Sequence, residues 1–199
     1  GDYKNEEYPE NCVVVDNPPF SILAEIVRFY TAAKIEFFLF APGLSLFGPV
    51  QKHCTAIVTD SQITYANNAT VCTGFLTSLF PGVRIMVSTS LHNSISAAIR
   101  KKKKGGCLKA KYPENIVTSA LLNAAVGGGD FIILDSECEW IREMDAMQMA
   151  GKSLFGSGYL LSSSAAMRVA VAKNLNSHTY NWELSQREKN IIKRLNAQN

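Results

Sequence analysis

Apolar residues near the start of the chain follow the pattern of a strand, a helix and a second strand. The run Cys12–Val15 is apolar at every position, which is typical of a buried central strand. Apolar side chains then recur from Ile22 to Tyr30 at the spacing of one helix face, with Ser21 as the expected N-cap. A second strand is expected at Ile35–Phe40. This order predicts a right-handed βαβ unit, and therefore an α/β fold with a doubly wound, mostly parallel sheet.

The middle of the chain is rich in short β-branched segments. Strands are expected at Thr55–Val58, Ile63–Tyr65, Thr70–Leu79 and Val83–Val87. Asn67-Asn68 is the expected turn of an antiparallel hairpin between two of these strands, because asparagine tolerates the left-handed backbone of tight turns.

A hydrophilic run from Arg100 to Gly106 divides the chain. We therefore expect a first segment, residues 1–100, that holds half of the doubly wound sheet, and a smaller mixed α+β segment, residues 101–199. The elements expected in the second segment are a helix from Pro113 to about Ala125, a strand at Phe131–Leu134, and a final amphipathic helix that starts at a capping box, Ser185 to Glu188.

The composition is that of a globular protein, with 47% hydrophobic and 19% charged residues among 199. A net charge of +3 permits a nucleic-acid partner without requiring one. The five cysteines are widely spaced and the three histidines lack metal-ligand spacing, so we expect no disulfide framework and no metal. No apolar run approaches the roughly 20 residues that span a bilayer. Together with the polar start of the sequence, this predicts a cytoplasmic protein without a membrane partner.

The residues with the clearest chemical meaning follow the first strand and read Asp16-Asn17-Pro18-Pro19-Phe20. The two prolines stiffen the loop, because proline fixes its own backbone and restricts the residue before it. Asn17 offers a side-chain oxygen and Pro18 a main-chain carbonyl, and two fixed acceptors can hold both hydrogens of an exocyclic amine. Phe20 offers a flat ring on which a nucleic-acid base can stack. The alternative is a structural Pro-Pro turn after a strand.

Asn17-Pro18-Pro19-Phe20 resembles the catalytic motif of amino-directed methyltransferases, which is Asp, Asn or Ser, then Pro-Pro, then Tyr or Phe. The wider strings Val13–Ser21 and Phe37–Pro42 resemble the EcoRI-type adenine-specific DNA methyltransferase family in particular. Residues 111–115 and 182–185 are similar to that family as well, though less specifically. The resemblance implies a Rossmann-like fold and methyl transfer from S-adenosylmethionine to the N6 amine of adenine in DNA, as in restriction-modification or phage enzymes.

The resemblance also implies roles for individual residues. Asn17 and Pro18 would orient the amine, Pro19 would fix the turn and Phe20 would stack on the base. Asp16 and Ser21 are expected to support the loop.

Four adjacent cations in the hydrophilic run are a candidate contact for DNA phosphates, namely Lys101, Lys102, Lys103 and Lys104. They lie in the region where the resemblance implies the DNA-recognition portion. A solvated surface loop is the equal alternative.

The donor site is the part of the pattern that is not found. In the usual order the donor-binding half precedes the motif, and too few residues precede Asn17 for the strands and helices that this half needs. We therefore expect a missing N-terminal half or a separate donor-binding subunit. In a permuted order the donor loop follows the motif, and Phe155, Gly156 and Gly158 are then the candidates, with a structural glycine turn as the alternative.

Two other functions agree with the same residues. Amino-directed methyltransferases with an Asn-Pro-Pro motif also act on RNA bases and on glutamine amides. The chain is alternatively a non-catalytic module, derived from such an enzyme, that binds DNA or pairs with a donor-binding subunit.

Overall fold

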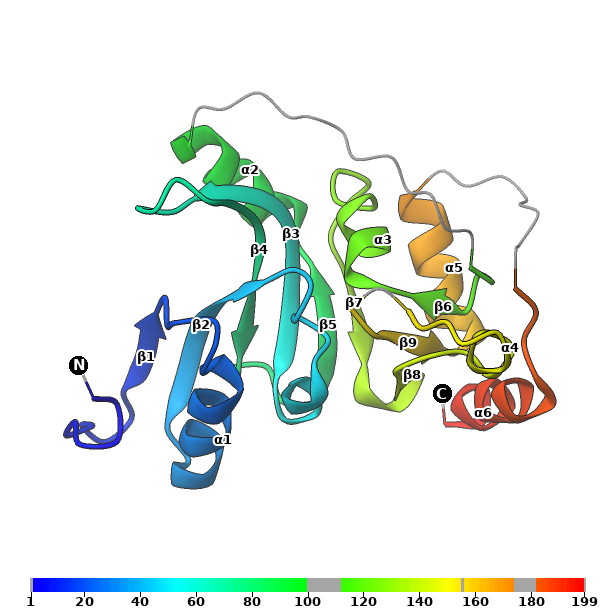
Figure 1. The fold of residues 1–199 in the computed structure, drawn as a ribbon, viewed down its shortest axis with the longest axis horizontal. Coiled ribbons are helices and arrows are strands. Elements are labelled where there is room, and N and C mark those ends of the chain that lie inside the picture. Colours follow the sequence, from blue (N-terminus) through cyan, green and yellow to red (C-terminus); the bar gives the residue numbers. More distant parts are fainter. Residues whose placement is uncertain (1, 100–111, 155, 174–181, 199) are drawn as a thin grey trace.

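The computed structural model describes residues 2–99, 112–154, 156–173 and 182–198. Within these ranges the chain forms an α/β fold with two sheets, one on each side of the molecule in Figure 1. The larger sheet has six strands in the order β1-β2-β4-β3-β5-β7, and the smaller sheet has three in the order β6-β9-β8. The α/β class expected from the sequence is confirmed.

The strands of the larger sheet are β1 (Val13–Asp16), β2 (Glu36–Pro42), β3 (Thr55–Thr64), β4 (Thr70–Thr77), β5 (Val83–Val87) and β7 (Phe131–Leu134). The βαβ unit is confirmed, because β1 and β2 are parallel neighbours joined by helix α1 (Leu23–Ala33). The sheet is nevertheless mixed rather than mostly parallel. Of its five pairs of neighbouring strands, β1–β2 and β3–β5 are parallel and the other three are antiparallel.

The expected hairpin is confirmed between β3 and β4. Asn68 adopts a left-handed backbone with φ of 61°, and the Asn67 side chain accepts a hydrogen bond from the Ala69 amide at 3.1 Å. The two strands expected before this turn belong to one strand, β3, whose register with β4 shifts between Ile57 and Ser61. The hairpin returns β4 between β2 and β3, which is why the sheet becomes mixed.

The position of β1 corrects the expectation of a buried central strand. β1 is the first strand of the larger sheet, at its left edge in Figure 1. Val13 is 41% exposed and Val15 is 69% exposed, whereas Val14 packs against the main core. A run of three valines suits a strand covered on both faces, but the pattern alone does not say whether a neighbouring strand is present.

The main core lies on one face of the larger sheet. Helix α1 covers this face with Val27 and Tyr30, and the Tyr30 ring lies 6.0 Å from the ring of Phe37 on β2. A 3-10 helix, η1 (Pro49–His53), follows β2 and adds Val50 to the same cluster. Leu161 of the smaller sheet also belongs to the cluster, so this main core extends to both sheets.

The remaining elements are α2 (Thr89–Ile99), β6 (Ile116–Val117), α3 (Ser119–Asn123), the 3-10 helix η2 (Asp135–Glu137), β8 (Cys138–Ile141), α4 (Asp145–Met149), β9 (Gly158–Leu161), α5 (Ser163–Ala172) and α6 (Gln186–Ala197).

The helix expected from Pro113 to Ala125 is wrong. The β-branched pair of β6 forms a strand there, and the helix starts only after Thr118, whose side chain caps it. The capping box of Ser185 and Glu188 at α6 is confirmed.

Residue 100 does not separate two sheets. β7 belongs to the second segment of the sequence, yet it pairs with β5 of the first.

An ion pair between buried Glu137 of η2 and Arg168 of α5 joins elements of the second segment, and the Glu137 carboxylate also accepts a hydrogen bond from the Leu134 amide at 2.9 Å. Burial opposes ionisation of Glu137, but these donors outweigh it and hold its pKa below the usual value.

Candidate functional site

Four strands of the larger sheet end with their carboxyl ends along the same side of the sheet, which is called its carboxyl edge. β1 and β2 are parallel, β3 and β5 are parallel, and β4 runs antiparallel to both β2 and β3. β1, β2, β3 and β5 therefore point the same way. The segment Asn17–Phe20, the β3–β4 turn and the start of α2 all follow or join strand ends at this edge. Open α/β sheets bind ligands at the carboxyl ends of their strands.

The loop Asn17–Phe20, called the proline loop, presents two hydrogen-bond acceptors to which no described residue donates. Asn17 is exposed and Pro18 is buried, so the loop is anchored by one residue and open at the other. Within the described part of the chain, neither the Asn17 side-chain oxygen nor the Pro18 carbonyl accepts a hydrogen bond. The Pro19 carbonyl, by contrast, accepts the Ile22 amide at 3.1 Å. Asn17 and Pro18 thus keep the acceptors that the motif predicts for an amine.

The Asp16 side chain makes a hydrogen bond within the loop, whereas Ser21 does not act as a cap. The Asp16 carboxylate accepts a hydrogen bond from the backbone amide of Asn17 at 2.7 Å, which fixes the chain where it leaves β1. The N-cap of α1 is Ile22, and no side chain caps this helix. The N-cap role of Ser21 is therefore corrected. The chain makes a turn through Pro19 and Ile22 before the helix starts, so the helix begins one residue later than expected.

A second aromatic residue stands beside the loop. The Tyr65 ring lies 5.4 Å from that of Phe20, at an interplanar angle of 82°, in an edge-to-face arrangement. Tyr65 directly follows β3, and its amide donates to the Ala69 carbonyl at 2.9 Å across the turn. Its hydroxyl lies 3.2 Å from the Thr73 hydroxyl. Sequence reasoning missed Tyr65 as a site residue, although the predicted Asn67-Asn68 turn could have placed an aromatic side chain at the hairpin tip.

A network behind the hairpin holds the edge of the sheet together. The Asp60 amide donates to the Asn123 side chain at 3.2 Å, and that side chain donates to the Cys72 sulfur at 3.1 Å. The His92 ring nitrogen Nδ1 lies 2.5 Å from the Thr59 carbonyl. Burial raises the pKa of the Cys72 thiol and the charge of Asp60 raises it further, so this thiol stays protonated at neutral pH. These residues brace the strands and offer no nucleophile.

The glycines of the candidate donor loop are closely packed. Phe155 lies outside the described residues. Gly156 has a φ of +81°, and a Cβ there would meet the Leu44 carbonyl oxygen at 2.7 Å. A Cβ on Gly158 would meet the Val117 carbonyl oxygen at 2.4 Å, and Gly158 begins β9 instead of following a strand. On the side where a Cβ would stand, Gly156 and Gly158 therefore lie against neighbouring backbone, an approach that glycine permits.

The lysine run proposed to contact DNA phosphates lies outside the described residues. This holds for all four of its members, Lys101, Lys102, Lys103 and Lys104. The structure therefore does not test the expected phosphate contact, which stays a prediction from the sequence.

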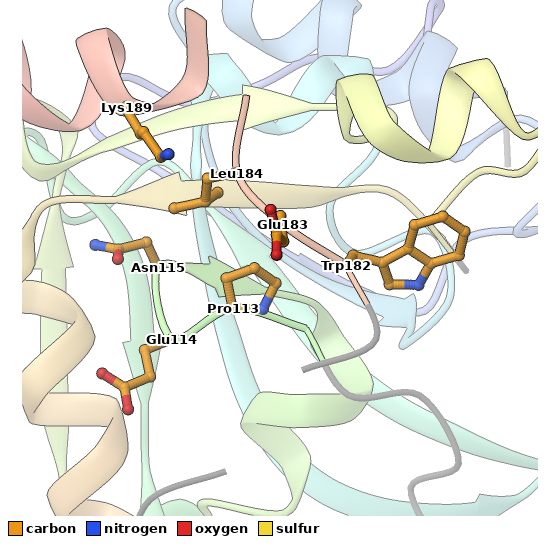
Figure 2. Close-up of a pocket in the computed structure, with 7 residues that line it drawn as sticks. All are labelled: Pro113, Glu114, Asn115, Trp182, Glu183, Leu184 and Lys189. Carbon is orange, nitrogen blue, oxygen red and sulfur yellow. The ribbon is translucent and has the colours of Figure 1, made fainter. Parts of the chain in front are cut away.

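A pocket lies away from the proline loop, on the smaller-sheet side of the molecule. It is lined by residues 113–115, residues 182–184 and Lys189, and Figure 2 shows Glu183 between Pro113 and Trp182. Its lining carries two carboxylates, Glu114 and Glu183, and one ammonium group, Lys189, so its net negative charge disfavours phosphate. This pocket therefore does not extend the candidate site toward a nucleic-acid backbone.

Three further observations bear on the identity of the site. Within the described residues, no group of three or more His, Cys, Asp or Glu side chains is placed to hold a metal ion. Likewise, no described helix has the length and apolar character needed to cross a bilayer. No protein-family model, curated protein or solved structure matches the chain.

Proposed function

We propose that this protein methylates the N6 amine of adenine in DNA, with S-adenosylmethionine as the methyl donor. The observation that carries the proposal is the pair of unoccupied acceptors on Asn17 and Pro18, held in a stiff loop at the carboxyl edge of the sheet. The aromatic pair of Phe20 and Tyr65 lies beside them.

The acceptors address the chemical difficulty of the reaction. The lone pair of an exocyclic adenine amine is delocalised into the ring, which makes the nitrogen a poor nucleophile. If the Asn17 oxygen and the Pro18 carbonyl each accept one of the amine hydrogens, the nitrogen moves toward a tetrahedral geometry and its lone pair becomes available. S-adenosylmethionine supplies a methyl group already activated by its sulfonium. Positioning is thus the main contribution asked of these residues.

The aromatic pair favours a flat base over a glutamine amide. A base that has left the duplex loses its stacking partners, and stacking on an aromatic side chain returns roughly 1–3 kcal/mol. Phe20 would take this role, and Tyr65 holds the position of the Phe20 ring by the edge-to-face contact. A primary amide has no comparable flat ring system to stack, so two adjacent rings would gain little from it.

The test is the transfer of a tritiated methyl group to duplex DNA, single-stranded RNA and a glutamine-containing peptide. The protein is assayed alone and with extract from its native cells. Asn17→Ala removes one acceptor and is expected to lower transfer to DNA at least ~100-fold, as the loss of a positioned polar group does in other active sites. Ser21→Ala is the matched control, because Ser21 is exposed and does not cap α1. Methyl transfer that survives in Asn17→Ala would refute the proposal. Methyl transfer to RNA alone, or to the peptide alone, would show that this molecule and not DNA is the substrate.

A further inference from the structure

We propose that the pocket on the smaller-sheet side of the molecule binds a free basic amino acid with a guanidinium group, of which L-arginine is the simplest example. No residue of the proline loop lines this pocket, so the inference is independent of the proposed methyl transfer. The pocket has a volume of about 510 Å³, within the range of small-molecule sites, about 300–1,000 Å³. Its charged side chains are Glu114, Glu183 and Lys189.

The walls of the pocket are held in place by the fold. On one side, the Asn115 side-chain amide donates to the Leu161 carbonyl at 2.9 Å, and the Asn115 carbonyl accepts a hydrogen bond from the Leu161 amide at 2.7 Å. On the other side, Trp182 and Leu184 pack against a hydrophobic cluster formed by the smaller sheet and α6. The capping box of α6 fixes the start of the helix that carries Lys189. A ligand therefore meets formed walls and loses little affinity to the ordering of the protein.

The charged groups of the pocket have no partner among the described residues. Within that part of the chain, the side chains of Glu114, Glu183 and Lys189 form no hydrogen bond and no ion pair, so the opposite charges are held apart. Three other carboxylates of the same region each pair with an arginine, namely Glu137, Glu139 and Asp145. The pocket thus offers its charges to a ligand, whereas its neighbours use theirs within the protein.

The charges of the pocket specify the class of ligand. Two carboxylates and one ammonium are complemented by a molecule with two cationic groups and one anionic group. A free basic amino acid carries this set at neutral pH, in its side-chain cation, its α-ammonium and its α-carboxylate. A polyamine lacks the carboxylate, a neutral amino acid lacks the second cation, and a basic residue inside a peptide lacks both α-charges. The complementary ligand is therefore a free basic amino acid.

One end of the pocket suits a guanidinium group. Figure 2 shows Glu183 between Pro113 and Trp182. A planar guanidinium pairs with a carboxylate through two parallel hydrogen bonds and stacks on an aromatic ring. Lys152, which does not line the pocket, places its Nζ 5.5 Å from the centroid of the Trp182 ring, so the ring is positioned to attract cations. The ammonium of lysine has neither the flat shape nor the paired donors, so this end favours arginine over lysine.

The other end of the pocket suits the α-amino acid group. In Figure 2, Glu114, Asn115 and Lys189 lie at the end away from the tryptophan. The Lys189 ammonium can bind the α-carboxylate, while the Glu114 carboxylate and the Asn115 side-chain oxygen accept hydrogens of the α-ammonium. Pro113 and Leu184 lie between the two ends and offer apolar surface to the methylene groups of the ligand.

The first test is an NMR titration of the isotope-labelled chain with L-arginine, at neutral pH and low salt. We expect a Kd on the order of 0.1–1 mM, as for a small ligand at an open pocket. The amide signals that shift should be those of residues 113–115 and 182–189. No shift up to about 10 mM L-arginine, or shifts confined to other residues, would overturn the inference.

The second test compares ligands that lack one group each. L-citrulline keeps the shape of arginine but has a neutral urea in place of the guanidinium, and agmatine lacks the carboxylate. We expect each to bind at least ~5-fold more weakly than L-arginine, because each loses a charge-assisted hydrogen bond. Equal binding of L-citrulline would overturn the inference. So would tighter binding of agmatine, because attraction would then follow positive charge alone, and tighter binding of L-lysine would overturn the assignment of the guanidinium.

The third test assigns the charged groups of the ligand to residues of the pocket. Glu183→Gln should weaken L-arginine binding roughly 5- to 10-fold and leave L-citrulline binding unchanged, because its partner is the guanidinium. Lys189→Met should weaken L-arginine binding by a similar factor and leave agmatine binding unchanged. Lys193→Met is the matched control, since Lys193 is an exposed lysine of the same helix that does not line the pocket. An equal loss in Lys193→Met, or a loss that is the same for all ligands in either pocket variant, would overturn the inference.

Discussion

The contact between Phe20 and Tyr65 can be measured in the purified chain without any enzymatic activity. The rings are 5.4 Å apart at 82°, a geometry worth about 0.5–1.5 kcal/mol beyond simple burial. Phe20 is half-buried, so we expect the lower part of this range, about 0.5–1 kcal/mol. The perturbations are Phe20→Ala, Tyr65→Ala and the double variant, which together form a double-mutant cycle.

The assay is urea unfolding at 25 °C, followed by circular dichroism. The summed losses in free energy of unfolding of the two single variants should exceed the loss in the double variant by the coupling energy, because the first truncation already removes the contact. Tyr65→Phe is the control, since it keeps the ring and removes only the hydroxyl beside Thr73. Effects that add within about 0.3 kcal/mol would refute the contact, because that is the additivity expected of independent sites.

Three further predictions concern stability. Glu137→Gln should weaken the loss of stability at acid pH. The pKa of Glu137 in the folded state lies below its unfolded value, so its contribution to the free energy of unfolding is present above about pH 4.3 and is lost as the pH falls through the folded pKa. Urea unfolding measured at several pH values from 7 to 3 would show the difference. Gly128→Ala should cost about 1–3 kcal/mol in urea unfolding, because its Cβ would stand 1.9 Å from the Ala172 carbonyl oxygen, and an unchanged unfolding midpoint would contradict this close approach. Ser185→Ala should cost about 1 kcal/mol through the lost cap of α6, and an unchanged Tm would contradict the capping box.

The sequence predicts best those elements that are determined by local pattern and turn chemistry. The helix after the proline loop, the strand that follows it and the Asn67-Asn68 hairpin are all found. The helix expected after Pro113 is wrong because the pair Ile116-Val117 finds a strand partner in β9, about 40 residues later in the sequence. Strand pairing over such a separation overrides local helix propensity, and no local pattern reports it.

Strand position within a sheet is equally hidden from local pattern. The valines of β1 predict a strand covered on both faces, and in this chain the strand is at the edge. The residues are consistent with both situations, because apolar side chains on both faces indicate only that cover is favourable. Among the described residues β1 has a neighbouring strand on one side only, and strand order is a property of the assembled sheet.

The candidate site shows the same division between local and long-range information. Asn17, Pro18 and Phe20 lie within four consecutive residues, so their relation follows from the stiffness of the Pro-Pro loop and can be predicted from the sequence. Tyr65 reaches Phe20 only because β4 returns between β2 and β3 and places the hairpin tip over the loop. The two acceptors of Asn17 and Pro18 thus belong to one local loop, whereas the ring contact of Phe20 depends on a distant hairpin. Only the first of these is contained in one short stretch of sequence, and this explains why the residues proposed to bind an amine are the ones that the sequence identifies.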